Sequence, residues 1–168
     1  GESSDAIKLV NESALQTIVG NVFKQWQLQG KASADVSLGL PLAGAKTPAD
    51  IEVAVQLSDT DVTIPEYRLQ FTDVNGPLIY SSQRGIYSSG LNANLYRKPF
   101  VVRVNQDEEK SVLVDFSGRA DMRDILDWSQ QAALSFATGE TNIAAQVKVN
   151  PKGESAFTVS SNLLGVDI

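Results

Sequence analysis

The chain has 168 residues, of which 42% are hydrophobic and 20% are charged, and its net charge at pH 7 is −6. These values are typical of a soluble folded protein and argue against intrinsic disorder. The 14 basic residues are scattered, whereas nucleic-acid binding needs a clustered basic surface, so we expect no nucleic-acid partner. Because cysteine and histidine are absent, thiol chemistry, histidine acid–base relays and zinc sites of sulfur and imidazole are excluded.

The first predicted element is an amphipathic helix within residues 1–28. Hydrophobic residues recur there at helical spacing and form one stripe, and Asn11 or Ser13 is a suitable N-cap. No stretch of the sequence reaches the roughly 18 apolar residues of a membrane-spanning helix. The stripe consists of Leu15, Ile18, Val19, Val22, Phe23 and Trp26.

Beyond this helix, hydrophobic residues alternate with polar ones at a period of two. This pattern predicts strands with one dry and one wet face, which is typical of antiparallel sheets. Turn-forming residues interrupt the pattern and predict about ten short strands. The predicted turns are 41–48, 75–77, 83–85, 105–110 and 150–153.

A second amphipathic helix is predicted after Asp121, which is a suitable N-cap. Its hydrophobic positions run from Met122 to Phe136 and include Ile125, Leu126, Trp128, Ala132 and Ala133, and Gly139 follows its predicted end.

The start of the chain recurs near its end. In both places a helix is followed by glycine, an alternating strand and a proline turn, at 30–41 and again at 139–151. The next strands also correspond, since 49–55 resembles 153–159 and Asp61-Val62-Thr63-Ile64 resembles Gly165-Val166-Asp167-Ile168. The offset of about 105 to 110 residues indicates one complete repeat and the opening of a second.

These patterns predict a mainly β (α+β) fold of about ten antiparallel strands and two amphipathic helices, in which repeats stack along one axis. Residues 1–28 are the predicted N-terminal linker and helix. Residues 29–120 are one antiparallel sheet unit, and 121–168 are the second helix and the start of the next repeat.

The order of several short motifs resembles the YhdP group of AsmA-like bacterial envelope proteins. The motifs are the run from Leu69 to Tyr80, the strand from Gly85 to Ala93, the strand from Lys98 to Val102, Phe116-Ser117-Gly118, and Leu126-Asp127-Trp128. Each motif is degenerate, so the resemblance rests on their order over most of the chain. It implies that the antiparallel strands form a curled sheet, which is part of a repeating β-groove. It also implies an interior or C-terminal segment of a longer protein that is anchored in the inner membrane and crosses the periplasm of a Gram-negative bacterium.

The resemblance also implies a non-enzymatic function, namely to shelter phospholipid acyl chains and pass them toward the outer membrane. The expected partners are these acyl chains and neighbouring repeats of the same chain, with self-association of edge strands as a further possibility and no cofactor or metal. Every second side chain of a bent sheet points inward. The candidate groove lining is Val36, Leu38, Leu40, Val53, Val55, Leu57, Leu69, Phe71, Leu78, Tyr80, Val102, Val104, Val112, Val114, Phe116, Val147 and Val149.

The alternative from the residues alone is a closed β-sandwich that serves as a structural or protein-interaction spacer in a large envelope protein, with the same residues as an ordinary core. No catalytic motif supports an enzyme. Asp59-Thr60-Asp61 is interpreted as a strand-end turn, and Asp121, Asp124 and Asp127 are interpreted as solvated residues of the second helix.

Overall fold

The computed structural model describes residues 26–39, 49–132, 135–152 and 154–167. Leu40 and residues 1–25 of the predicted N-terminal linker and helix lie outside these residues. Trp26, the last residue of the predicted stripe, is not in a helix, and Gln27 and Leu28 belong to a strand. The described strands are β1 (Gln27–Gly39), β2 (Asp50–Ile64), β3 (Leu69–Ser81), β4 (Gly85–Leu95), β5 (Lys98–Gln106), β6 (Val112–Asp121), β7 (Thr138–Val149), β8 (Ala156–Ser161) and β9 (Val166–Asp167).

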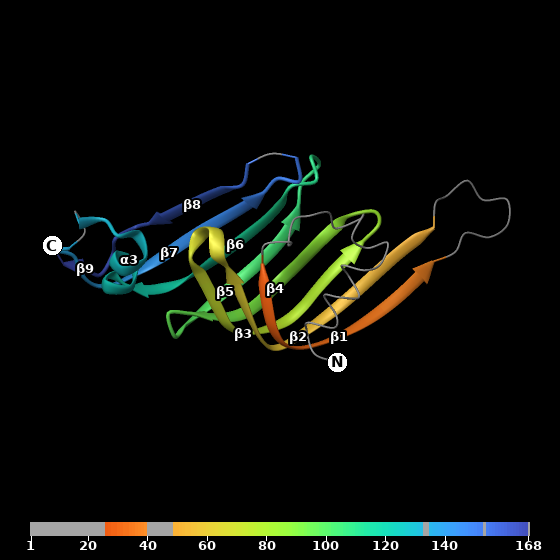
Figure 1. Ribbon diagram of the computed structural model, residues 1–168, viewed down its shortest axis with the longest axis horizontal. Helices are drawn as coiled ribbons and strands as arrows, with labels where there is room; N and C mark the ends of the chain where they lie inside the picture. Colours follow the sequence, from red (N-terminus) through yellow and green to blue (C-terminus); the bar gives the residue numbers. More distant parts are fainter. Residues whose placement is uncertain (1–25, 40–48, 133–134, 153, 168) are drawn as a thin grey trace.

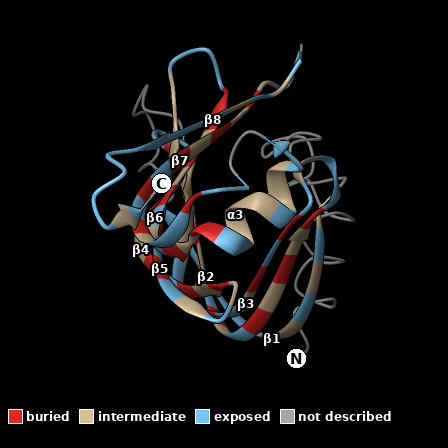
Figure 2. Cartoon of the chain, turned by 90° about the vertical axis from the view of Figure 1, so that its left-hand side faces the viewer, coloured by how far each residue is buried: buried red, intermediate tan, exposed pale blue. Residues whose placement is uncertain are grey.

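These strands form one antiparallel sheet in which β1 to β8 lie side by side in chain order and β9 pairs with β7 (Figure 1). Within the described residues, two short helices lie in the links: η2 (Pro65–Tyr67) joins β2 to β3, and α3 (Met122–Ser129) lies between β6 and β7. Seen along the molecule, the strands curve around α3 (Figure 2). The mainly β, curled and unclosed sheet predicted from the sequence is confirmed, and the described strands do not form the two packed sheets of a sandwich.

The alternation of the sequence sets the register of β6 and β7. Pairing of β6 with β7 runs from Val112 opposite Val149 to Asp121 opposite Glu140 without a shift. Because side chains alternate between the two faces of a strand, Val112, Val114 and Phe116 of β6 meet Val149, Val147 and Ala145 of β7 on the same face. That face is buried and forms the core, whereas the opposite face carries the polar residues.

Two of the predicted turns lie inside strands. Asn75, Gly76 and Pro77 belong to β3, where the pairing with β2 and β4 is shifted, and Asp59, Thr60 and Asp61 belong to β2. Turn-forming residues here produce β-bulges, which bend a strand without ending it. Long strands therefore replace pairs of predicted short ones, and the described part of the chain contains nine strands instead of about ten.

Helix α3 begins as predicted and ends earlier than predicted. The Asp121 carboxylate accepts a hydrogen bond from the backbone N–H of Arg123 at 2.9 Å, which is an N-cap. The helix ends at Ser129, since Gln130 adopts a left-handed conformation and its N–H donates to the carbonyl oxygen of Leu126. Phe136 therefore lies outside the helix and is 76% exposed. No helix in the described ranges is long and apolar enough to cross a membrane.

The pairing of β1 with β2 contains the same irregularity as the pairing of β7 with β8 and β9. From Leu28↔Val62 to Lys31↔Ser58, β1 advances three residues while β2 moves back four. From Gly139↔Val166 to Ile143↔Ser161, β7 advances four residues while its partners move back five. In each case a glycine with positive φ, Gly30 or Gly139, lies at the shift, so the two predicted repeats share a bulge as well as a sequence pattern.

Candidate functional site

The candidate site is the apolar face of the sheet, here called the inner face. Its side chains stand in rows that cross from strand to strand. One row contains Ser88, Val104, Val114, Val147 and Phe157, and the next contains Leu91, Val102, Phe116, Ala145 and Val159. The first row continues through Leu78 and Val55 to Ala34, so a lateral band of mostly apolar side chains reaches from β8 to β1.

The predicted lining residues that the structure describes lie on this one face. Val55, Leu78 and Tyr80 are half-buried, and Leu38 at the end of β1 is 58% exposed. Only the backbone of Val36 is described, and it pairs with Val53. The buried members are Val53, Leu57, Leu69, Phe71, Val102, Val104, Val112, Val114, Phe116, Val147 and Val149.

Several inner-face residues were absent from the predicted lining. Leu91, Ala93 and Leu95 alternate along β4 and are buried, so a period-two count over this strand identifies them. Val74 and Ile86 are also buried on this face. Val74 was not found because the bulge in β3, where Asp73 has a φ of 52°, interrupts the alternation and reverses which positions point inward.

Three aromatic side chains cross the inner face, and we call Tyr67, Trp128 and Phe157 the aromatic clasp. The Tyr67 ring, from η2, stacks on the Phe157 ring of β8 with centroids 5.2 Å apart. Trp128, from α3, meets Phe157 edge-on at 5.4 Å. Below them, Phe157 lies 6.3 Å from Phe116 of β6, which packs against Phe71 of β3 at 5.1 Å. The clasp thus connects the two sides of the curled sheet above the buried floor.

Two hydrogen bonds hold the clasp on its η2 side. The indole Nε1 of Trp128 donates to the carbonyl oxygen of Tyr67 at 2.8 Å, and Nη2 of Arg68 donates to the carbonyl oxygen of Trp128 at 2.7 Å. Burial, followed by the charge of Glu66, raises the pKa of the Tyr67 hydroxyl. The clasp is therefore an apolar contact with two hydrogen bonds at its margin, one of them from the charged Arg68 guanidinium.

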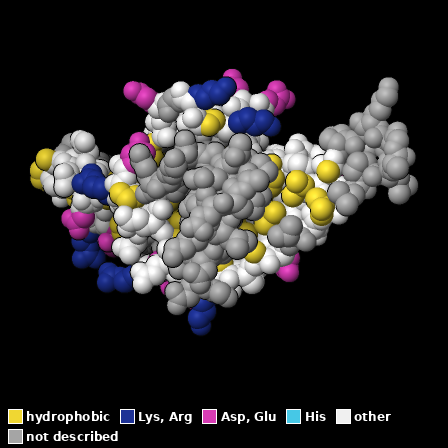
Figure 3. Space-filling model, turned by 45° about the vertical axis from the view of Figure 1, so that its right-hand side comes forward, with side chains coloured by type: hydrophobic (Ala, Val, Ile, Leu, Met, Phe, Trp, Pro, Cys, Tyr) yellow, Lys and Arg dark blue, Asp and Glu magenta, His cyan; other side chains and the backbone are white. Residues whose placement is uncertain are grey.

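The inner face is exposed on either side of the clasp. Val159 on β8 is 48% exposed although it belongs to an inner row. At the other end of the sheet, Leu38 is exposed beside the half-buried Ile51. Hydrophobic side chains are accordingly visible at the surface near the β1–β2 end of the molecule (Figure 3). Water-accessible apolar surface of this kind is available for an apolar ligand.

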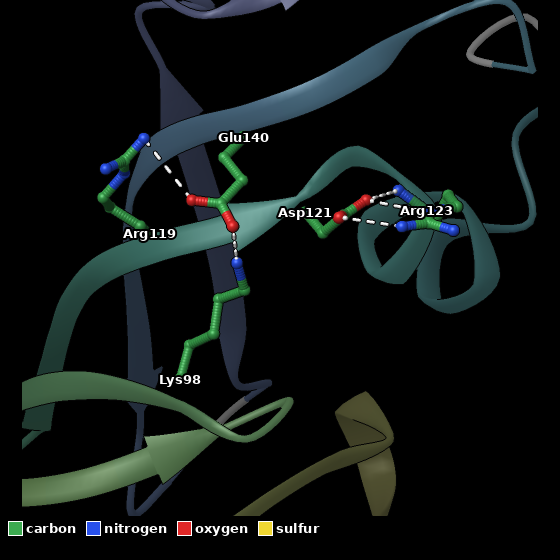
Figure 4. Close-up of polar contacts among 5 residues, drawn as sticks. All are labelled: Lys98, Arg119, Asp121, Arg123 and Glu140. Carbon is green, nitrogen blue, oxygen red and sulfur yellow. Dashed lines mark hydrogen bonds and ion pairs between the residues drawn. The ribbon is translucent and has the colours of Figure 1, made fainter.

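An ion-pair cluster lies where β5, β6 and β7 approach α3 (Figure 4). The Glu140 carboxylate is bound by Nζ of Lys98 and by Nη2 of Arg119, the latter at 3.4 Å. The hydrogen bond from Lys98, together with its charge, lowers the pKa of Glu140. Arg123 lowers the pKa of Asp121 through a hydrogen bond in the same way. These ion pairs lie at the polar margin of the sheet.

The opposite face of the sheet contains a hollow of about 1200 Å³, here called the outer hollow. It crosses β3 to β8 and borders the Lys98–Glu140 ion pair. Its outward-pointing side chains include Asn92, Asn94, Ser117, Arg119, Asn142 and Ser160. The molecule therefore presents one apolar and one polar face.

Comparison with known proteins agrees with the order of motifs in the sequence. No curated protein and no solved structure matches the chain significantly. The family model described as YhdP protein matches residues 1–168, which is the whole chain. Together with the curled antiparallel sheet, this match shows that the chain belongs to the YhdP protein family of bacterial envelope proteins.

Proposed function

We propose that this chain shelters phospholipid acyl chains on its inner face and passes them along the sheet without chemical change. In this proposal the longer protein is anchored in the inner membrane and carries lipid across the periplasm toward the outer membrane. The observation that carries the proposal is the band of apolar rows that crosses the open sheet from β8 to β1. Membership of the YhdP family supports it.

The physical basis is the transfer of hydrocarbon out of water. Each methylene group of an acyl chain that is removed from water contributes about 0.8 kcal/mol. A chain lying across Val159 and its half-buried neighbours needs no polar partner on the inner face, so its charged head group can remain in solvent at the margin of the sheet. This recognition requires no cofactor and no catalytic residue.

Two valines on opposite faces provide a matched test. Val159 is 48% exposed on the inner face, and Val101 is 37% exposed on the opposite face. Because both are accessible, replacement by aspartate adds a charge without burying it. The chain is purified from a bacterial periplasm, and bound phospholipid is measured by native mass spectrometry and lipid extraction.

We expect phospholipid with the unmodified chain and with Val101→Asp, and a loss of bound lipid with Val159→Asp. Equal lipid binding by both variants would show that the inner face is not the binding surface. A lipid-free mass for the folded, unmodified chain would refute acyl-chain sheltering by this segment.

The second candidate is a protein-interaction or spacer role, and the outer hollow is the observation that favours it. A hydrophobic dye distinguishes the two roles, since an acyl-chain groove binds the dye on the inner face and a spacer with a filled inner face does not. The partners we propose are acyl chains and neighbouring repeats that extend the sheet at β1 and β8. These two strands are its lateral edges among the described residues, and self-association through them is a further proposal.

A further inference from the structure

The aromatic clasp lies beside the path that the proposed function requires. Phe116 and Val102 belong to the same inner row as the exposed Val159, yet both are buried. Tyr67 and Trp128 contact Phe157, which belongs to the neighbouring row and whose ring centroid lies 6.3 Å from that of Phe116. An acyl chain that extends from Val159 to Phe116 on β6 therefore passes beside the clasp.

The segments that form the clasp are suited to move. Helix α3 has only eight residues, and Met122 at its first turn is its one buried residue. Its other end is held by the Trp128 ring and by the hydrogen bonds with Tyr67 and Arg68. The link η2 has three residues, none of them buried, and ends at Arg68 in a left-handed conformation. Segments with few buried contacts open at low free-energy cost.

We propose that the aromatic clasp is a gate in the groove. It is closed when Tyr67 and Trp128 rest on Phe157, and it opens when η2 and the C-terminal end of α3 move away from β8. Opening removes the contacts of the aromatic rings with the floor of the groove. An acyl chain that enters the open groove packs against the same floor, so its hydrocarbon compensates for the lost ring contacts. This inference rests on the proposed function, since it concerns the same inner face.

A reversible cross-link tests the gate. The chain has no cysteine, so Tyr67→Cys with Phe157→Cys places two unique thiols in the clasp. A short bis-methanethiosulfonate reagent closes this pair, and a reducing agent releases it. The control is Ser117→Cys with Ala144→Cys, because these residues are opposite each other in β6 and β7 and both are exposed on the polar face.

The probe is a phosphatidylethanolamine with a diazirine at the end of one acyl chain, carried in phosphatidylethanolamine–phosphatidylglycerol vesicles. After illumination, mass spectrometry locates adducts on two peptides, the exposed one around Val159 and the floor around Val102 and Phe116. Cross-linking the clasp should keep adducts at Val159 and reduce those on the floor on the order of tenfold. Reduction should restore the floor adducts, and the control pair should show no change.

The outcomes separate the gate from the proposed function. Floor adducts that persist with the clasp cross-linked would overturn the gate and leave acyl-chain binding in place. Absence of adducts at both peptides in the reduced chain would overturn acyl-chain binding and the gate together. Adducts at Val159 alone, before and after reduction, would show that acyl chains do not reach the floor even when the Tyr67 and Phe157 rings are removed, which also overturns the gate.

Discussion

Gly118 lies directly opposite Phe100 in the pairing of β5 with β6, and the Phe100 ring occupies the space where a side chain at position 118 would stand. A Cβ atom on residue 118 would lie 2.7 Å from Cγ of Phe100 and 2.7 Å from the carbonyl oxygen of Pro99. Phe100 is buried and lies 6.3 Å from Phe116, ring centroid to ring centroid. The absent side chain at 118 thus allows a large ring to lie flat on the floor of the groove.

We expect Gly118→Ala to destabilise the chain by about 1–3 kcal/mol, since the new methyl group overpacks a closely filled site. Gly90 provides the control, because no atom lies within 4 Å of the position that its Cβ would take. Gly90→Ala should leave the free energy of unfolding nearly unchanged. Urea denaturation of both variants measures the difference, and equal stability would contradict the assigned packing of Phe100.

The fold class could be predicted from the sequence because alternation with period two is a local signal that each strand carries by itself. The run from Val112 to Phe116 and the run from Ile143 to Val149 required no knowledge of their neighbours. In the structure these runs are the neighbouring strands β6 and β7, whose pairing has no register shift.

The bulges and the clasp could not be predicted in the same way. The sequence Asn75-Gly76-Pro77 favours a turn locally, and only its pairing with strands on both sides keeps it within β3. The clasp depends on the curl of the whole sheet, which brings Tyr67 to Phe157 and Trp128. Trp128 was correctly placed on a helix, but no periodicity indicates which distant ring it meets.

Because Glu140 forms an ion pair with Lys98, we expect the free energy of unfolding to fall at acidic pH. A pKa lowered by Lys98 means that the folded state binds a proton less readily than the unfolded state, in which the Glu140 pKa is near 4.5. The stabilisation is therefore present above pH 4.5 and is lost as the pH falls through the folded-state pKa. Glu140→Gln should be less stable than the unmodified chain at neutral pH, and the difference should narrow below pH 4.5.

Urea denaturation from about pH 7 to about pH 3 measures this difference. Glu154 is exposed, and Glu154→Gln is the control that should match the unmodified chain throughout. If Glu140→Gln is less stable than the unmodified chain by the same free energy of unfolding at every pH, the carboxylate contributes by packing and not by charge.

We expect the free energy of unfolding to fall at alkaline pH because of the Tyr96 hydroxyl group. It is buried without a hydrogen-bond partner, and burial, together with the nearby charge of Asp124, raises its pKa to about 12 from the ordinary 10.0. Because the unfolded state ionises first, the stabilisation is complete below pH 10.0 and is lost as the pH rises toward about 12.

Tyr96→Phe removes this dependence and leaves no buried hydroxyl unpaired, so the variant should be at least as stable as the unmodified chain at neutral pH. Thermal unfolding between about pH 9 and about pH 11 should show a smaller loss of stability for the variant. An equal alkaline loss in both proteins would exclude Tyr96 as the responsible group.

The measurement that tests the central claim most directly is site-specific photocross-linking from the two faces of the sheet. Benzoylphenylalanine is placed at Val159 on the inner face or at Val101 on the opposite face, both exposed positions. The full chain is illuminated with phosphatidylethanolamine vesicles, and adducts are identified by mass. The account predicts acyl-chain adducts from position 159 and none from position 101. Equal yields from both positions, or no lipid adduct from position 159, would contradict it.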